Sequence, residues 1–393
     1  MKRLGLYVHF PFCLHKCAYC DFYSITDHER ISDYIDALML QCNDYATAAE
    51  PYAIDSIFFG GGTPSIIPAK YMHEFIDCVY EKFNVSVNAE FTMEVNPATV
   101  KLPQLRKLYK AGVNRISIGA QSACDNELKA LSRIHNYEEF EECFRTVRKA
   151  GFENINVDIM YGIPEQTFDS FCTTLEKIVA LDPEHISLYN LKIEENTPFG
   201  KMGDSLVLPD EDEEYRMYEY AIEYLSSHGY DQYEISNFAK KGKECVHNLK
   251  YWTCSEYLGL GTGAHSYFIN TRFSFIKDVN AFISTLKDLD DDRKLTDENY
   301  TINPEERVGE YIMLSLRLKQ GINLVEFERV FGVDFEMMFS DLLPVYIENG
   351  FMEKTAVGYA FTTKGMYVSN YILSTMLDFS SSIDENIANG SDK

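Results

Sequence analysis

The segment Leu4-Gly-Leu-Tyr-Val-His-Phe10 leads directly into the loop Cys13-Leu-His-Lys-Cys17-Ala-Tyr-Cys20. The apolar run predicts a buried strand. The three thiols after it are too closely spaced for ordinary disulfides between neighbours, and the spacing C-x3-C-x2-C suits thiolates that hold one inorganic centre. A [4Fe–4S] cluster usually takes four cysteines. With three, one iron keeps an open coordination position.

An open coordination position is where a metal does chemistry, whereas closed metal sites are structural. An iron with such a position can chelate the amino and carboxylate groups of S-adenosylmethionine (SAM). A reduced cluster can then pass an electron to the sulfonium and release a carbon radical. Two other interpretations stay open on the residues alone: a zinc site made by the three cysteines with His9 or His15, and three unrelated buried thiols.

The composition is that of an ordinary globular protein. Of 393 residues, 46% are hydrophobic and 25% are charged, which allows about two to three domains. The 36 Lys and Arg residues against 61 Asp and Glu residues give a net charge of −25, which disfavours nucleic acid and anionic lipid as partners. The N-terminus resembles neither a signal peptide nor a transmembrane helix. We therefore expect a cytoplasmic protein whose cysteines stay reduced.

The first half of the chain alternates short apolar runs with amphipathic segments. The candidate strands are residues 4–10, 54–59, 90–95, 115–118, 154–160 and 185–191. The candidate helices between them are residues 29–44, 68–83, 103–111, 137–150 and 168–181, and another is expected over 210–227. This repeated order predicts parallel pairing in an α/β fold, and either a doubly wound sheet or a barrel satisfies it. Four cysteines in the helical patterns are expected to be core residues: Cys42, Cys78, Cys143 and Cys172.

Distinctive residues collect where these strands end, and parallel α/β folds build active sites at the carboxyl ends of their strands. They are the cysteine loop, Gly60-Gly-Gly-Thr-Pro64, Glu94, Asn96, Gly119, Gln121, Asp158 and Asn190. In the glycine run, the missing side chains are expected to leave backbone N–H groups free to approach a ligand closely.

The stretches Tyr7-Val-His-Phe-Pro-Phe-Cys13 and Cys17-Ala-Tyr-Cys-Asp-Phe22 resemble the radical SAM superfamily. More narrowly, they resemble the oxygen-independent coproporphyrinogen III oxidase group and, within it, the HemW heme chaperones. The resemblance extends over about residues 4–377. It implies a [4Fe–4S] cluster on Cys13, Cys17 and Cys20, and a partial (β/α)6 TIM-like barrel in place of a doubly wound sheet.

The resemblance also implies roles for residues around SAM. Gly61, Gly62 and Thr63 match the element that holds the methionyl amino group, and Glu94 matches a residue that contacts the ribose or the amine. The other matching positions near SAM and the cluster are Gln121, Arg133, Asp158, Tyr7 and Tyr19. A guanidinium such as that of Arg133 suits the SAM carboxylate, because the two groups can form a bidentate pair.

Two features separate a heme chaperone from the oxidase. The oxidase carries a fourth cysteine two residues past the third, where this chain has Phe22, and it has an extended N-terminal segment that this chain lacks. In addition, residues 247–252, His-Asn-Leu-Lys-Tyr-Trp, match the chaperone motif H-N-x-x-Y-W. Imidazole is a good axial ligand of heme iron, so His247 is a candidate heme ligand.

The function expected from the resemblance is to bind heme, together with the cluster and SAM, and to deliver heme to acceptor hemoproteins such as respiratory enzymes. The alternative is oxidative decarboxylation of coproporphyrinogen III. Heme propionates need local cations in so acidic a chain, and the candidates are Lys192, Lys250 and Arg272. We also expect that the protein can form a homodimer.

The rest of the chain predicts a smaller second domain. Residues 304–319, 324–331 and 335–348 are expected to be helices, 350–354 and 358–361 a hairpin, and 363–377 a last helix. This order suggests a winged-helix-like module that lacks a basic face. We expect a barrel over 1–230, an extension with the H-N-x-x-Y-W motif over 231–290, a C-terminal helical domain of the HemN type over 291–378, and a disordered tail over 379–393.

Overall fold

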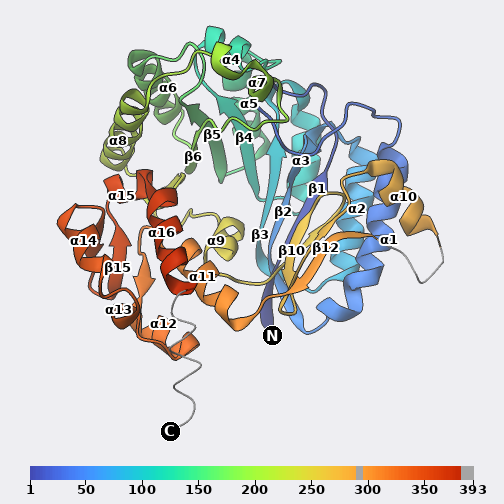
Figure 1. The fold of residues 1–393 in the computed structure, drawn as a ribbon. Coiled ribbons are helices and arrows are strands. Elements are labelled where there is room, and N and C mark those ends of the chain that lie inside the picture. The colour runs from blue at the N-terminus through green and yellow to red at the C-terminus, as the bar shows by residue number, and fades with distance from the viewer. Residues whose placement is uncertain (289–294, 382–393) are drawn as a thin grey trace.

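The computed structural model describes residues 1–288 and 295–381 (Figure 1). Its central feature is a run of six parallel strands that pair in the order in which they occur along the chain. They are β1 (Lys2–Phe10), β2 (Tyr52–Gly61), β3 (Val85–Val95), β4 (Arg115–Gln121), β5 (Ile155–Tyr161) and β6 (His185–Asn190). All six predicted strands are confirmed. Five are apolar on most positions because both faces of the sheet are covered.

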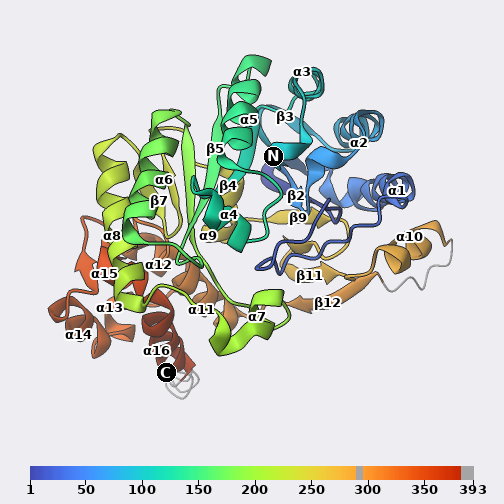
Figure 2. The ribbon, with the colours of Figure 1, turned by 90° about the horizontal axis from the view of Figure 1, so that it is seen from above.

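The helices that follow these strands along the chain lie along the outer face of the curved sheet, as the view from above shows (Figure 2). They include α1 (Ile31–Ala49), α2 (Ala69–Lys82), α3 (Leu102–Lys110), α5 (Tyr137–Ala150), α6 (Phe168–Ala180) and α8 (Glu211–Ser227). The short helices α4 (Asp125–Ala130) and α7 (Pro198–Met202) were not expected. The strands curve without closing, which confirms a partial barrel and excludes a doubly wound sheet.

Strands from residues 231–275 and 296–301 extend the barrel sheet at both sides, so the sheet described here has twelve strands. The added strands are β7 (Asp231–Glu234), β8 (Asn237–Ala239), β9 (Tyr257–Leu260), β10 (His265–Phe268), β11 (Thr271–Phe275) and β12 (Thr296–Thr301). β8 pairs with β6 and β9 pairs with β1. A helix, α10 (Val279–Lys287), packs beside α1.

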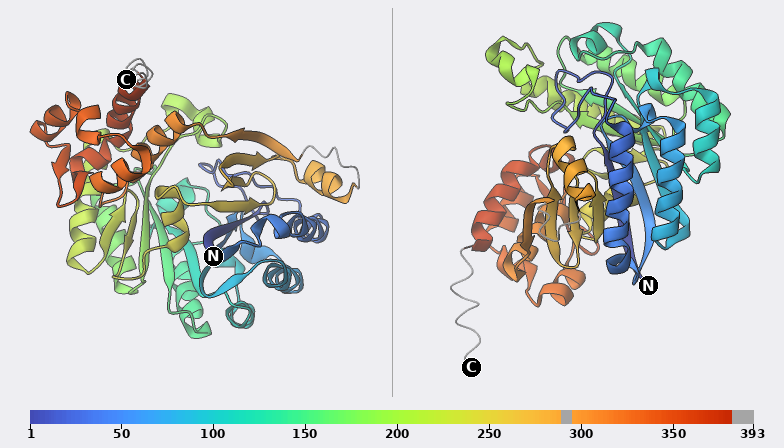
Figure 3. Two further views of the ribbon diagram at one scale, coloured as in Figure 1. Left: turned by 90° about the horizontal axis from the view of Figure 1, so that it is seen from below. Right: turned by 90° about the vertical axis from the view of Figure 1, so that its right-hand side faces the viewer.

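The H-N-x-x-Y-W motif forms a short helix, α9 (Val246–Trp252), on the concave side of the sheet (Figures 1 and 3). It packs against β2 and against α11 (Pro304–Ser315) of the C-terminal region. The carboxylate of Glu90 on β3 accepts hydrogen bonds from the backbone N–H groups of Val246 and His247, at 3.1 and 3.0 Å. Since these donors have no partner within the helix, a barrel strand fixes where the motif begins.

The C-terminal region combines short helices with an antiparallel sheet of order β13–β15–β14, which confirms a winged-helix-like module. Its further elements are β13 (Ile322–Asn323), α12 (Leu324–Phe331), α13 (Phe335–Met338), α14 (Leu342–Glu348), β14 (Met352–Lys354), β15 (Gly358–Phe361), α15 (Thr363–Tyr367) and α16 (Ser369–Ser381). The single helices expected over 335–348 and 363–377 are each broken in two. Their buried side chains continue the hydrophobic core of the barrel.

Two predictions fall outside the described residues: the boundary near residue 290 and most of the tail over 379–393. Among the helices that the structure describes, none has the length and hydropathy needed to cross a bilayer.

Candidate functional site

A cavity of about 550 Å3 opens at the carboxyl ends of the parallel strands. Its lining includes all the site residues predicted from the sequence except two: Cys13, Cys17, Tyr19, Cys20, Gly61, Gly62, Thr63, Glu94, Gln121, Arg133 and Asp158. The exceptions, Tyr7 and His247, line a smaller cavity of about 140 Å3 that shares Gly61 and Glu94 with the larger one. The topology therefore brings together residues that lie up to 145 positions apart, from Cys13 to Asp158.

Two backbone hydrogen bonds hold the cysteine loop in place. The Cys13 backbone N–H donates to the Ile25 carbonyl at 2.9 Å, and the Ala18 N–H donates to the Leu131 carbonyl at 3.3 Å. Ala18 is buried beside Leu131 in a small apolar cluster. The three cysteines are free thiols with partly exposed side chains on the cavity wall.

The donor set fits an iron–sulfur cluster better than zinc. In the described part of the chain, no three His, Cys, Asp or Glu side chains converge closely enough to hold a single metal ion. Zinc needs its donors at about 2.0–2.3 Å from one point, whereas a cubane spreads three thiolates over three iron atoms. The Thr63 hydroxyl lies 3.4 Å from the Cys13 sulfur, and hydrogen bonds to cluster sulfurs tune the reduction potential.

The glycine loop differs from the expectation of free N–H groups. The Gly61 N–H donates to the Glu94 carboxylate at 3.1 Å, the Gly62 N–H to the Phe10 carbonyl at 2.8 Å, and the Thr63 N–H to the Phe12 carbonyl at 2.7 Å. The three donors therefore already have partners in the protein. An ammonium group, which needs acceptors, suits this loop better than an anion does.

Gly61 is required by its conformation. Its φ is +102°, which L side chains rarely adopt, and a Cβ there would lie 2.4 Å from the His9 ring. The His9 ring in turn bridges the Tyr7 hydroxyl, at 3.1 Å, and the Tyr23 carbonyl, at 2.8 Å. The glycine thus lets the loop pack directly on the side chain that positions Tyr7.

Two carboxyl groups, Glu94 and Asp158, face the cavity from neighbouring parts of the sheet. Burial, and then the charge of Asp158, raise the pKa of Glu94 to about 8. Burial also raises the pKa of Asp158, although Ser117 and Asn156 donate hydrogen bonds to its carboxylate at 3.1 and 2.7 Å. Perturbed acids in a cavity are typical of functional sites, and both groups gain from a ligand that donates hydrogen bonds.

Arg133 and Gln121 complete the wall nearest the cysteine loop. The Arg133 guanidinium lies 3.6 Å from the Cys17 sulfur and 3.5 Å from the Tyr19 hydroxyl, and it donates to the Gly119 carbonyl at 2.9 Å. Gln121 has a left-handed backbone, with φ at +65°, where the pairing of β4 with β5 is irregular. This strain turns Gln121 into the cavity, and strained backbone clusters at functional sites.

His247 is buried, and both of its ring nitrogens have partners. Nδ1 lies 3.0 Å from the Ser56 hydroxyl and Nε2 lies 2.9 Å from the Tyr251 hydroxyl. Burial, followed by the charges of Lys250 and Arg115, lowers the pKa of His247 to about 3. The ring is therefore neutral, as an axial ligand must be, and ligation of iron through Nε2 requires that the Tyr251 hydroxyl move away.

The three cations expected to receive propionates are already paired. Lys192 lies 2.5 Å from Glu194, and the buried Lys250 lies 2.6 Å from Asp55. Arg272 forms an ion pair with Glu310. Each of these side chains therefore already neutralises a local carboxylate, and a role for them toward propionates stays a prediction.

Sequence reasoning missed a polar layer beneath the residues that are expected to contact SAM. Arg115, Ser117, Asn156 and Ser187 line the lower part of the cavity, and Asn248 of the H-N-x-x-Y-W motif reaches both cavities. The available signal was the alternation in β4, where Arg115, Ser117, Gly119 and Gln121 interrupt an otherwise apolar strand. In a fully buried strand, such an alternation marks a polar interior.

Two family models match the chain. That of the radical SAM superfamily matches residues 7–178, and that of the HemN C-terminal domain matches residues 302–368. The superfamily match implies a [4Fe–4S] cluster and SAM, and the free cysteines and the cavity described above fit both.

Curated relatives match over nearly the whole chain. The heme chaperone HemW of Bacillus subtilis is 33% identical over 94% of this chain and 98% of its own length. HemW of Escherichia coli is 38% identical over 67% of this chain and 70% of its own length. The structure of coproporphyrinogen III oxidase (HemN) from Escherichia coli, a radical SAM enzyme, superposes with a TM-score of 0.82 at 22% identity, over 96% of this chain and 90% of that one. This last likeness shows the fold alone.

Proposed function

This chain belongs to the HemW family of the radical SAM superfamily, and we propose that it binds heme and delivers it to acceptor hemoproteins such as respiratory enzymes. The observation that carries the proposal is the match to heme chaperones along almost the full length of both chains. Phe22, which is 68% exposed, stands where the oxidase has its fourth cysteine. In this proposal the protein works in the cytoplasm, and a homodimer stays a prediction.

The residues of the larger cavity have the chemistry to hold a cluster and SAM. A bound cluster supplies an electron and an open coordination position. Cys13, Cys17 and Cys20 would hold it, and Arg133, beside the Cys17 sulfur, would orient the SAM carboxylate. Glu94 and Asp158 would accept hydrogen bonds from the SAM ribose or amine. We propose that these groups serve assembly or regulation more than turnover.

Hemin titration of the anaerobically reconstituted full-length protein tests the proposal. The expected result is a saturable Soret band, followed by transfer of the bound hemin to apomyoglobin as a model acceptor. In parallel, the protein is incubated anaerobically with reductant, SAM and coproporphyrinogen III. Formation of the vinyl product, or the absence of a Soret band, would contradict the chaperone proposal, and the vinyl product would establish the oxidase.

The proposed axial ligation by His247 has its own matched pair of variants. Tyr251→Phe removes the hydroxyl that occupies Nε2, so hemin affinity is expected to stay or rise. His247→Ala removes the ring, so the Soret maximum is expected to shift. A His247→Ala protein with the same Soret maximum and affinity as the wild type would rule out ligation by this residue.

A further inference from the structure

Arg115 stands out among the buried cations of the barrel. It is the first residue of β4, its side chain is 1% exposed, and it lines the lower part of the larger cavity. Its one hydrogen bond within the described chain is a long one, 3.4 Å from a terminal nitrogen to the Thr92 hydroxyl, and its Nε has no partner there. No carboxylate of the described residues lies within ion-pair distance of it.

The other arginines with an unpaired Nε differ from Arg115. Arg133 has three partners on its terminal nitrogens, Arg272 pairs with Glu310, and Arg317 donates to Asn370 at 2.8 Å. Asp158, an acid that lines the same cavity, accepts its hydrogen bonds from Ser117 and Asn156 and not from Arg115. Against the effect of burial, Glu90 and Asp158 act on the Arg115 guanidinium through space and raise its pKa, but neither carboxylate forms an ion pair with it. Burying a charge without direct hydrogen-bonded partners is costly, so the cavity is suited to an anionic ligand that contacts the guanidinium.

SAM does not account for both guanidinium groups of the cavity. It has one carboxylate, and Arg133 already lies beside the Cys17 sulfur, where the open iron position would bring that carboxylate. Arg115 is the first residue of β4, whereas Arg133 contacts the carbonyl of Gly119 near the other end of that strand. Arg115 is therefore available to a second anion, and guanidinium favours planar carboxylates that it can contact with two nitrogens.

We propose that Arg115 is the receptor for a carboxylate at the floor of the cavity, and that this carboxylate is a propionate of the tetrapyrrole. The inference rests on the proposed heme function and deepens it. It also answers the charge problem, because the net charge of −25 repels propionates. Lys192, Lys250 and Arg272 each form an ion pair, whereas Arg115 forms none among the described residues and lines the cavity.

A comparison of two probes tests the inference on the wild-type protein. Hemin has two propionates, and hemin dimethyl ester has the same ring and iron without the carboxylate charges. A charge-assisted hydrogen bond predicts that the ester binds about 10- to 100-fold more weakly than hemin. Equal affinities would overturn the inference. If the wild-type protein binds neither probe, the proposed function itself fails.

The variant Arg115→Met tests whether Arg115 causes the difference in affinity between hemin and its ester. Methionine replaces the aliphatic stem of the side chain without the guanidinium and its charge, and apolar replacements of buried charges are tolerated. In Arg115→Met, the affinity for hemin is expected to fall to that for the ester, and the affinity for the ester is expected to stay unchanged. Arg115→Lys is expected to keep part of the difference in affinity between the two probes. A hemin-to-ester ratio that stays within twofold of the wild type, or a tenfold loss of SAM affinity with hemin binding intact, would contradict the proposal.

Arg148→Met is the matched control. Arg148 also lies next to the parallel strands, but outside the cavity, and its guanidinium is fully engaged by Glu184 and two backbone carbonyls. This variant is expected to lower stability and to keep the hemin-to-ester ratio. An equal change of the ratio in both variants would show a general structural effect and overturn the role of Arg115.

Discussion

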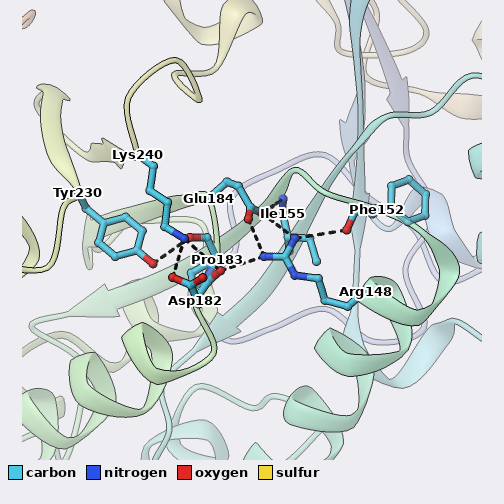
Figure 4. Close-up of polar contacts among 8 residues, drawn as sticks. All are labelled: Arg148, Phe152, Ile155, Asp182, Pro183, Glu184, Tyr230 and Lys240. Carbon is cyan, nitrogen blue, oxygen red and sulfur yellow. Dashed lines mark hydrogen bonds and ion pairs between the residues drawn. The ribbon is translucent and has the colours of Figure 1, made fainter.

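The two edges of the parallel sheet hold charged groups in opposite ways. At the amino edge, Arg148 at the end of α5 lies 2.8 Å from Glu184, which also accepts the Ile155 N–H at 2.9 Å, and Lys240 lies 2.6 Å from Asp182 (Figure 4). Every charge shown there has a partner in the protein. At the carboxyl edge, by contrast, burial raises the pKa values of both Glu94 and Asp158.

The difference separates stability from binding. Polar groups that bond to one another fix the turns beneath the barrel. Arg148 donates to the Asp182 carbonyl and to the Glu184 carboxylate, just before β6, and Glu184 also accepts the Ile155 N–H at the start of β5. Polar groups that stay incompletely satisfied keep binding energy available for a ligand. Changes in the ion pairs of Figure 4 should therefore alter the free energy of unfolding, and changes among the residues that line the cavity should alter ligand binding.

The largest effect is expected for Cys17→Ala at the carboxyl edge. The variant should lose the cluster completely, measured as iron and sulfide content after anaerobic reconstitution, because two thiolates do not replace three. The free energy of unfolding of the apoprotein should change by less than about 0.5 kcal/mol, since the side chain is partly exposed. Cys143→Ala, at a buried helix position, is the control and should keep the cluster. A Cys17→Ala protein with full cluster content contradicts the assignment.

At the amino edge, Glu184→Ala should lower the free energy of unfolding by about 2–3 kcal/mol, measured by denaturant titration. It leaves Arg148 without its ion pair and the Ile155 N–H without its acceptor. SAM affinity should stay within twofold of the wild type. A strong loss of SAM binding without a loss of stability would break the division between the two edges.

Glu94→Gln should change how SAM binding depends on pH. With a pKa of about 8, Glu94 is mostly protonated at pH 7 and mostly ionised at pH 9, so a ligand that donates to the carboxylate binds more tightly as pH rises. We expect the wild-type affinity to rise about tenfold over this range, which is about 1.4 kcal/mol. The titration of SAM itself is common to both proteins, so the Gln variant should lack this rise. Identical pH profiles would exclude Glu94 from the contact.

The smallest effect is expected for Lys240→Met. Its partner Asp182 has a side chain that is 81% exposed, and exposed ion pairs contribute about 0–1 kcal/mol. The free energy of unfolding should fall by less than about 1 kcal/mol, and less at high salt. A loss of stability as large as that of Glu184→Ala would show that Lys240, and not Arg148 with its buried contacts, stabilises this edge.

The parallel strands and their site residues were predictable because buried strands appear as apolar runs and because distinctive residues such as Glu94 and Asp158 stand at or near the ends of these runs. The edge strands were not. β12, Thr-Asp-Glu-Asn-Tyr-Thr, is exposed at all positions but its first, so it resembled a polar linker, which is how natural sheets protect an edge.

Roles that depend on partners far apart in the chain were also not predictable. The N–H groups of the glycine loop are used by Phe10, Phe12 and Glu94, and nothing in the glycine run indicates this. Arg115 is a similar case. An arginine at the start of a strand suggests a solvent-facing position, and only the curvature of the sheet places it inside the barrel.

Mössbauer spectroscopy of the anaerobically reconstituted, 57Fe-labelled protein, recorded with and without SAM, tests the central claim most directly. If Cys13, Cys17 and Cys20 leave one iron of a cubane open beside Arg133 and Glu94, the spectrum should show a [4Fe–4S] cluster in which the parameters of one iron change when SAM is added. A protein without cubane iron, or a cubane whose four irons are indifferent to SAM, would contradict the account of this edge.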